Sequence, residues 1–338
     1  MNERLARFID RFFKLLMQRF RDPEIQTGPD VERRFHELLE LYRKIRVPEN
    51  VFPGGLASRI LIPRPDNFDE IEVRFDREMP GMPSPLRFSG PPVFHFHPPR
   101  KQPKASLVLI HGWRQPILGA VGRFARYCAA RGVASVMHEL PGHMNRRTDK
   151  RRPQGEGFSS PDPDVLLSSL FHAVAEVEAA RRFLKSLYPD VPAGILGVSL
   201  GGWLASLAAM LFEPDYVFLV SPAVAPERTF ADSVLFRRRR DQARRSAWGV
   251  DGFIDALKLL SPMCSDPLMP GAAVGVYAGR FDEIIPYEHM LDFSRLWETM
   301  PIRAVDHGHF SLIYFYPDLF RDVFAELSNH INTLPDRD

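Results

Sequence analysis

From residue 106 onward, short apolar runs alternate with stretches of helical periodicity, and this alternation limits the folds open to the chain. Runs of strand length occur at 106–110, 134–138, 193–198, 216–220, 273–278 and 302–305. Helical stretches separate or follow them, at about 121–131, 165–187, 200–212, 287–298 and 317–332. Strands joined through helices pair in parallel, because the connecting helices lie on the faces of the sheet. The alternation predicts an α/β fold with a mostly parallel sheet and helices on both faces.

Two further extended runs precede this series, at 71–75 and 93–97. We expect them to form a leading antiparallel pair, which brings the predicted sheet to eight strands. An insertion of mixed helical character, at about 225–262, follows the sixth strand. Insertions at this place commonly form a cap or lid over the active site. The insertion carries an arginine cluster, residues 237–240 with Arg244 and Arg245, which we interpret as a solvated helical face.

The first 66 residues are expected to form an N-terminal helical extension, and residues 67–338 the main domain. Helical periodicity is present at 2–21 and again at 31–45. The first helix places apolar residues on one face and basic residues on the opposite face. The apolar stripe consists of Leu5, Phe8, Ile9, Phe12, Leu16 and Phe20.

Two alternatives account for this apolar stripe. In the first, which we favour, the stripe packs against the main domain or against a second copy of the chain in a homodimer, while the arginines are solvated. In the second, residues 1–21 lie on an anionic membrane surface and the arginine cluster contacts acidic head groups.

Charge and cysteine content exclude several function classes. Lys and Arg number 44 against 42 for Asp and Glu, and because this leaves a net charge of only +2 we expect no nucleic-acid partner. Cys128 and Cys264 lie far apart and outside any metal-ligand spacing, so we expect a reduced, cytoplasmic protein. The sequence also has neither a secretory-signal pattern at its N-terminus nor an apolar stretch of membrane-spanning length.

The segment 194–202 carries a Gly-x-Ser-x-Gly pattern between a buried strand and a helix. A sharp strand-to-helix turn brings neighbouring backbone too close for a Cβ at the flanking positions, which explains Gly197 and Gly201. Ser199 would then be exposed at the strand tip as a nucleophile, and the N–H of Leu200 would point toward an oxyanion. The alternative is a glycine-tolerant turn with a solvated serine.

A second oxyanion donor is expected after the strand at 106–110. There His111, Gly112 and Trp113 follow in sequence, and the glycine lets the backbone turn away from the sheet edge. The backbone N–H of Trp113 is the predicted donor. The His111 side chain has the alternative role of bonding nearby backbone.

An acid and a base are expected at two later strand ends. Asp282 follows the strand at 273–278, where a carboxylate can hold an imidazole in the tautomer that catalysis needs. We prefer it to Glu283; its alternative role is to cap the next helix. His309 lies in the loop before the last helix and is the predicted general base and acid, with His307 as the second candidate.

These residues resemble the α/β-hydrolase superfamily, and in particular its serine esterases and lipases, over about residues 68–338. The order Ser199, Asp282, His309 matches the family order of nucleophile, acid and histidine. The loop at 138–143 resembles the strand-end loop that lines the active site in many members, although residues 144–147 depart from the small residues often found there. The resemblance implies an active site to which His111, His143 and Trp203 contribute substrate contacts.

The resemblance implies hydrolysis of a carboxylic ester, or of a related thioester or amide, through an acyl-enzyme on Ser199, with no metal and no cofactor. The expected substrate is a small-molecule or lipid ester. One alternative is a lysophospholipase, lipid acyl hydrolase or acyltransferase that acts at a membrane surface. A second alternative is a non-catalytic binding protein with the same fold.

The segment His95-Phe96-His97 places two histidines at alternate positions of a predicted strand. Such residues are more often surface or core positions, so we do not interpret them as a metal site.

Overall fold

The architecture comes from a computed structural model that describes residues 1–18, 60–63, 71–74, 89–115, 118–160, 162–246, 249–264, 273–299 and 301–333. The second predicted helix, at 31–45, lies outside these residues. Among the described helices, none is both long and apolar enough to cross a membrane.

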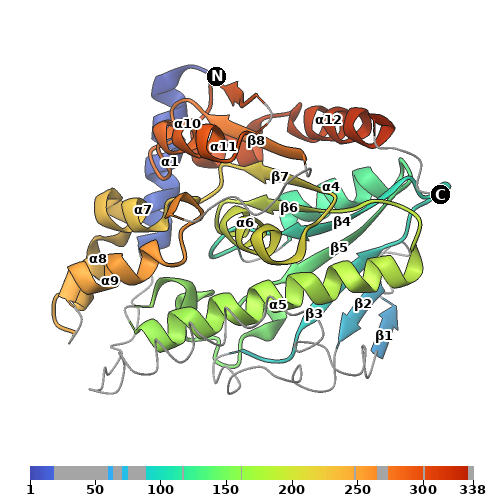
Figure 1. Ribbon diagram of the computed structural model, residues 1–338. Helices are drawn as coiled ribbons and strands as arrows, with labels where there is room; N and C mark the ends of the chain where they lie inside the picture. The colour runs from blue at the N-terminus through green and yellow to red at the C-terminus, as the bar shows by residue number, and fades with distance from the viewer. Residues whose placement is uncertain are drawn as a thin grey trace.

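A nine-stranded sheet runs through the centre of the molecule, in the order β1-β2-β3-β5-β4-β6-β7-β8-β9 (Figure 1). Its first three pairings are antiparallel and the remaining five are parallel. The mostly parallel sheet and the leading antiparallel pair are confirmed. The strands are β1 Ile60–Pro63, β2 Ile71–Arg74, β3 Val93–His97, β4 Ala105–Ile110, β5 Val133–Glu139, β6 Ala193–Val198, β7 Tyr216–Val220, β8 Ala273–Gly279 and β9 Arg303–Val305.

The strand β1 was not among the eight predicted strands. It pairs with β2 through the register Ile60 to Arg74. Residues 60–63 therefore belong to the sheet, although we had placed them in the N-terminal extension.

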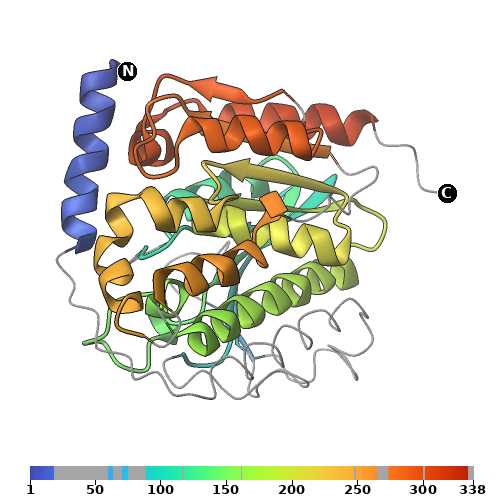
Figure 2. The same cartoon turned by 60° about the vertical axis from the view of Figure 1, so that its left-hand side comes forward.

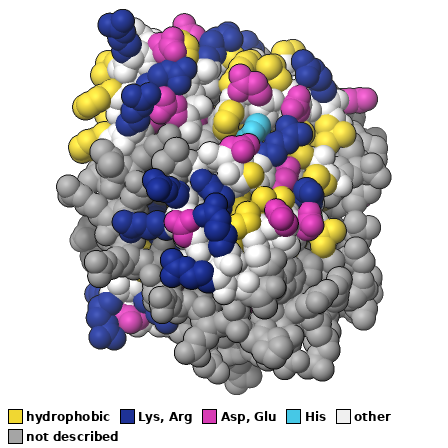
Figure 3. Space-filling view, turned by 90° about the vertical axis from the view of Figure 1, so that its left-hand side faces the viewer, with side chains coloured by type: hydrophobic (Ala, Val, Ile, Leu, Met, Phe, Trp, Pro, Cys, Tyr) yellow, Lys and Arg dark blue, Asp and Glu magenta, His cyan; other side chains and the backbone are white. Residues whose placement is uncertain are grey.

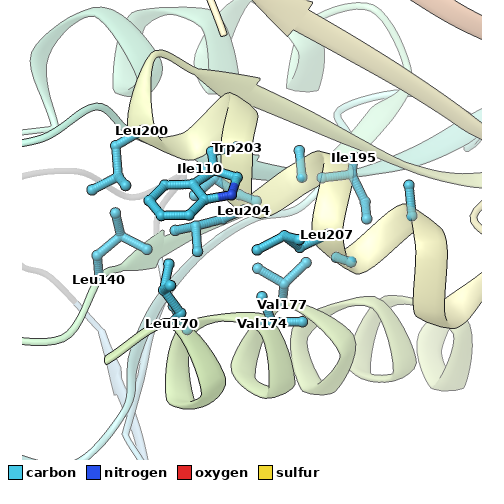
Figure 4. Close-up of a cluster of buried hydrophobic side chains, with 14 of the residues drawn as sticks. Ile110, Leu140, Leu170, Val174, Val177, Ile195, Leu200, Trp203, Leu204 and Leu207 are labelled. Atoms are coloured by element: carbon cyan, nitrogen blue, oxygen red, sulfur yellow. The ribbon is translucent and has the colours of Figure 1, made fainter. Parts of the chain in front are cut away.

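Helices cover both faces of the sheet because alternate strand residues point to opposite faces. On β4, Val108 and Ile110 pack in a cluster with α5 and α6, whereas Leu107 and Leu109 pack in a second cluster with α4, α11 and α12. Figure 4 shows the first cluster, in which Trp203 and Leu204 of α6 lie above Leu170 and Val174 of α5. These helices are α4 Gly119–Ala129, α5 Pro163–Leu187, α6 Leu200–Phe212, α10 Tyr287–Leu296, α11 His309–Phe315 and α12 Leu319–Thr333.

The insertion after β7 folds into short helices that lie over one end of the sheet, near the tip of β6 (Figure 2). Part of the arginine cluster is internal to this cap. Arg239 is buried, and the Arg240 guanidinium donates to the backbone carbonyls of Phe230 and Ser233. The elements are α7 Pro226–Asp232, η3 Val234–Phe236, α8 Arg237–Ala243, α9 Gly249–Lys258 and η4 Pro262–Cys264; two single turns, η1 Met144–Arg146 and η2 Glu156–Ser159, follow β5.

The N-terminal helix α1, Glu3–Gln18, lies beside the C-terminal elements and contacts α11 (Figures 1 and 2). Three members of the predicted stripe, Leu5, Phe8 and Phe12, are 49%, 64% and 50% exposed, so these side chains do not pack against the main domain as we expected. Ile9 is partly buried, and the side chains of Leu16 and Phe20 lie outside the described residues. A different face of α1 is docked, and its buried members are Ala6 and Asp10.

Candidate active site

Ser199 lies at the sharp turn between β6 and α6. Its backbone has φ 56° and ψ −114°, a conformation that is strained for a residue with a side chain. The Ser199 N–H donates to the carbonyl of Val220 on the neighbouring strand (2.9 Å), which fixes the turn against the sheet. A Cβ on Gly201 would overlap the carbonyl oxygen of Ile110, so the glycine is needed for close backbone approach.

His309 connects the serine to a carboxylate. Its Nε2 lies 2.9 Å from Ser199 Oγ, and its Nδ1 lies 2.8 Å from Asp282 Oδ2. An imidazole that donates from Nδ1 to Asp282 has the Nε2 lone pair free to accept the serine O–H. The structure places His309 as the first residue of α11, not in an irregular loop as we expected, because the loop ends at Gly308.

Asp282 follows β8 and has both of its oxygens engaged. Oδ2 accepts from His309, and Oδ1 accepts the backbone N–H groups of Ile284 and Ile285, each at 2.8 Å. These bonds hold the carboxylate in one orientation, as a residue that orients a histidine requires.

The two competing candidates point elsewhere. Glu283 forms ion pairs with Arg7 and Arg11 of α1, each at 3.1 Å. The ring of His307 packs 5.2 Å from the ring of Tyr316, and burial lowers the pKa of His307. Of the four candidates, His309 contacts Ser199, and Asp282 contacts His309.

The backbone at the two predicted oxyanion donors lies next to the serine. Leu200 directly follows Ser199 and begins α6. On the other side, a Cβ built on Gly112 would lie 3.4 Å from Ser199 Cβ, which brings the segment leading into Trp113 beside Ser199. The indole of Trp113 is fixed by a hydrogen bond from Nε1 to the carbonyl of Gly155 (2.8 Å) and by stacking on Phe236.

A cavity that is partly open to solvent begins at Ser199 and extends beneath the cap, and it measures about 630 Å³ when the adjoining open solvent is included. Its walls are almost entirely hydrophobic, and the described lining contains no charged side chain. Trp203 forms part of the wall, where its Nε1 donates to the carbonyl of Leu260 (2.9 Å). The lining consists of Trp113, Phe158, Ser159, Leu166, Ser199, Leu200, Trp203, Ala223, Pro226, Thr229, Phe230, Leu235, Phe236, Phe253, Leu257, Ile284 and Ile285.

The other two predicted substrate contacts, His111 and His143, are not among the residues that line this cavity. Both are fully buried, and both use their ring nitrogens on backbone groups. His111 bonds to the Gly112 carbonyl and accepts the Leu140 N–H, and burial lowers its pKa to about 4. His143 bonds to the Pro141 carbonyl and accepts the N–H of Arg114. Their bonding fits the backbone role that we gave as the alternative for His111.

One residue near the triad was missed by the sequence reasoning. Asp10 of α1 is fully buried and accepts the backbone N–H of His309 at 2.8 Å and that of Phe310 at 2.9 Å. Ala6 and Phe13 lie on the same helical face, four residues before and three residues after it, but these two residues do not distinguish that face from the more apolar stripe. Within the described ranges, no group of three or more His, Cys, Asp or Glu side chains is arranged to hold a metal ion.

Comparison with known proteins finds a relative that matches part of the chain. Uncharacterized protein MT2702 of Mycobacterium tuberculosis (strain CDC 1551 / Oshkosh) is 29% identical over 203 residues, which is 58% of this chain and 47% of that protein. The chain thus spans about half the length of this relative.

Two solved esterases share the fold at low sequence identity. Acetyl xylan esterase 1 from Thermoanaerobacterium sp. JW/SL YS485 has a TM-score of 0.63 at 14% identity, over 94% of this chain and 98% of its own. Est1E from Butyrivibrio proteoclasticus, solved with ferulic acid, has a TM-score of 0.55 at 17% identity, over 72% and 96%. A family model described as alpha/beta hydrolase family matches residues 107–333, and the chain belongs to that family.

Proposed function

We propose that this chain hydrolyses carboxylic esters through an acyl-enzyme on Ser199. The observation that carries the proposal is the position of His309, which lies within hydrogen-bond distance of both Ser199 Oγ and Asp282 Oδ2. A serine with its base and an orienting carboxylate is the arrangement that nucleophilic acyl transfer requires.

The reaction would proceed in two halves. His309 Nε2 takes the proton of Ser199 as Oγ attacks the acyl carbonyl, and the resulting imidazolium returns that proton to the departing alcohol oxygen. The same nitrogen then takes a proton from water, which attacks the acyl-enzyme, and the acid is released as Oγ regains its proton. Asp282 keeps Nδ1 protonated and Nε2 turned toward the serine in both halves.

The negative charge on the tetrahedral intermediate would be stabilised by the backbone N–H groups of Trp113 and Leu200. Such fixed dipoles act at the oxygen where charge develops and need no reorganisation during the reaction. The close approach of Gly112 to the serine supports Trp113 as the second donor.

The cavity supports an uncharged, apolar acyl group as substrate. Its wall beyond Ser199 is formed by aromatic and aliphatic side chains such as Trp113, Phe230 and Phe253. A carboxylate or ammonium group there would lose its hydration without gaining a partner from the described lining. The structural neighbours include both esterases and peptidases, so they do not decide between an ester and an amide.

A fluorophosphonate probe tests the proposal directly, because it reacts with activated serines. We expect the wild type to be labelled and to hydrolyse p-nitrophenyl butyrate, and Ser199→Ala to do neither while it unfolds at the same temperature. Equal labelling of the two proteins would show that Ser199 is not the nucleophile. A wild type that is neither labelled nor active would favour a non-catalytic binding protein instead.

Action on lipid esters at a membrane surface is a second candidate, and the exposed stripe of α1 favours it. Leu5, Phe8 and Phe12 are uncovered beside exposed Arg4, as expected of an interfacial helix. Figure 3 shows basic and hydrophobic side chains mixed on the side of the molecule that carries α1. We expect wild type, but not a variant with all three residues changed to serine, to float with anionic liposomes. Flotation of neither protein would remove this candidate, and a stripe-dependent dimer in solution would assign the stripe to a second copy.

A further inference from the structure

We propose that Asp10 of the N-terminal helix is a positioning residue of the active site, which holds the backbone that carries His309 and places a negative charge beside its imidazole. This inference rests on the proposed function, since it gives a role in that reaction to a residue far outside the triad. It makes α1 a part of the catalytic apparatus and not a separate extension.

The contacts of the Asp10 carboxylate are made with backbone donors around the triad. Oδ2 accepts the N–H of His309 at 2.8 Å and that of Glu283 at 3.3 Å, and Oδ1 accepts the N–H of Phe310 at 2.9 Å. The donors come from the start of α11 and from the residue after Asp282. One side chain thus connects the segment that carries the base to the segment that carries the acid.

The glycine at position 308 is independent evidence for the contact between Asp10 and the His309 N–H. Its φ of −90° is open to any residue, so backbone conformation does not require a glycine there. A Cβ at Gly308 would instead overlap the Asp10 carboxylate, because it would lie within 3 Å of the carboxylate carbon and of both carboxylate oxygens. The absence of a side chain at position 308 is what allows Asp10 to approach the N–H of His309.

Further contacts hold α1 against the main domain and thereby fix the position of Asp10. The ring of Phe13 stacks on that of Phe310 with centroids 4.7 Å apart, and it lies 5.8 Å from that of Tyr314. On the other side of Asp10, Arg7 donates to Glu283 at 3.1 Å. The carboxylate therefore lies between an aromatic contact to α11 and an ionic contact to the acid loop.

The charge of Asp10 has a consequence for the reaction. Burial and the nearby Asp282 raise the pKa of Asp10, whereas the charge of His309 and the backbone donors favour its ionised form. The other charged groups facing this region are Glu283 from the acid loop and the two guanidinium groups of Arg7 and Arg11 from α1, and these three compensate one another in part. An ionised Asp10 would stabilise the imidazolium that forms when Ser199 loses its proton.

The test compares Asp10→Asn with Glu3→Gln, a matched carboxylate-to-amide change on the same helix, where Glu3 contacts Arg7 at the surface. The assay is p-nitrophenyl butyrate hydrolysis by the full chain, normalised by fluorophosphonate titration of active sites. For Asp10→Asn we expect kcat to fall about tenfold to a hundredfold with KM changed less than about twofold, because the acyl cavity is intact while the base is misplaced.

The pH profile separates positioning from a loss of folded protein. Removal of a negative charge near His309 lowers the pKa of its imidazolium, so the acid limb of kcat/KM should move to lower pH by about half a unit. Glu3→Gln should keep both the wild-type kcat and the wild-type acid limb.

Wild-type kcat and an unmoved acid limb in Asp10→Asn would overturn the proposal while the labelling of Ser199 still supported the proposed function. If Asp10→Asn does not fold, Phe13→Ala replaces it, because that change keeps the carboxylate but removes the stack on Phe310. Phe13→Ala should lower kcat with KM unchanged, and an unchanged kcat would equally overturn the proposal. A wild type without labelling or turnover would instead defeat the proposed function itself.

Discussion

Ser199 and His309 lie in hydrogen-bond contact, but the chain holds them in two different ways. The serine turn is fixed by residues close to it in sequence and by the central strands, through Gly201 against Ile110 and the Ser199 N–H on Val220. The histidine is fixed by a helix almost 300 residues earlier in the chain, since Asp10 accepts its N–H across a sequence separation of 299.

This difference has a consequence for which changes are tolerated. The strain stored at the serine turn is sustained by the rigid centre of the sheet, where backbone groups meet at close range. The histidine side is also packed on the sheet through Leu312 of α11, but it depends in addition on one buried carboxylate and on the docking of α1. Substitutions near Ser199 should therefore reduce turnover strongly, and a second substitution should not restore it. Substitutions near His309 should reduce turnover less, and a second substitution should be able to compensate for them.

The largest effect is expected from Gly201→Ala. The added Cβ would overlap the Ile110 carbonyl oxygen, and because that oxygen is backbone, the overlap cannot be relieved without displacing β4 or α6. We expect loss of fluorophosphonate labelling, a fall in kcat/KM of at least about a thousandfold, and a fall in the free energy of unfolding of about 1–3 kcal/mol.

Gly122→Ala on α4 is the matched control, because a Cβ there would meet Met137 at an ordinary distance of 3.6 Å. It should label at the wild-type rate. Wild-type turnover in Gly201→Ala would mean that the serine side is no more rigid than the histidine side, and the comparison would fail.

An intermediate effect is expected from Gly308→Ala, and it should be reparable. In the wild type the new methyl group displaces the Asp10 carboxylate, so kcat should fall about tenfold to a hundredfold. In an Asp10→Ala background the space is free, and the double variant should turn over no more slowly than Asp10→Ala alone. Additive losses in this double-mutant cycle would show that Gly308 serves some purpose other than admitting Asp10.

The same division explains what the sequence could predict. The strand-turn-helix at Ser199 and the strand ends that carry Asp282 and His309 are local patterns, and strands and helices of the main domain were expected within a few residues of their observed bounds. The strand β1 was missed because Pro63 and Pro65 follow its three apolar residues, and prolines are typical of loops. The helix α11 was missed because its two turns are too short for a readable periodicity.

The role of α1 was hidden for a physical reason. Its hydrophobic stripe indicated the wrong docking face, because a helix can be held to a protein by a buried carboxylate and a few side chains while Leu5, Phe8 and Phe12 remain exposed. The partner of Asp10 is a set of backbone N–H groups, and backbone groups have no sequence signature. Periodicity alone therefore did not reveal that the helix contacts the candidate active site.

The smallest effect on turnover is expected at a second buried carboxylate, Glu176 of α5, and it sharpens the contrast with Asp10. Glu176 accepts two hydrogen bonds from Arg146, at 2.6 and 2.8 Å, and lies 2.5 Å from His138 Nε2. Burial opposes its ionisation, but the charge of Arg146 and the hydrogen bond of His138 prevail and lower its pKa to about 2. Its partners are other side chains on the sheet and the loop after β5, so it supports the fold and not the base.

A group whose pKa is lower in the folded than in the unfolded chain contributes stability above its unfolded pKa and loses it as the pH falls through the folded value. We therefore expect the free energy of unfolding of Glu176→Gln to be about 3 kcal/mol lower than that of the wild type at pH 7. Because the pKa falls from 4.5 to about 2, this deficit should shrink as the pH falls through that interval.

Urea unfolding at pH 7, 4 and 3 measures this deficit in the free energy of unfolding. We expect kcat at pH 7 to stay within about twofold of the wild type. Glu178→Gln on the same helix, whose partners Arg181 and Arg182 are partly exposed, should lose less. A large fall in kcat without loss of stability in Glu176→Gln would mean that the chain uses more than one distant carboxylate to hold its candidate triad.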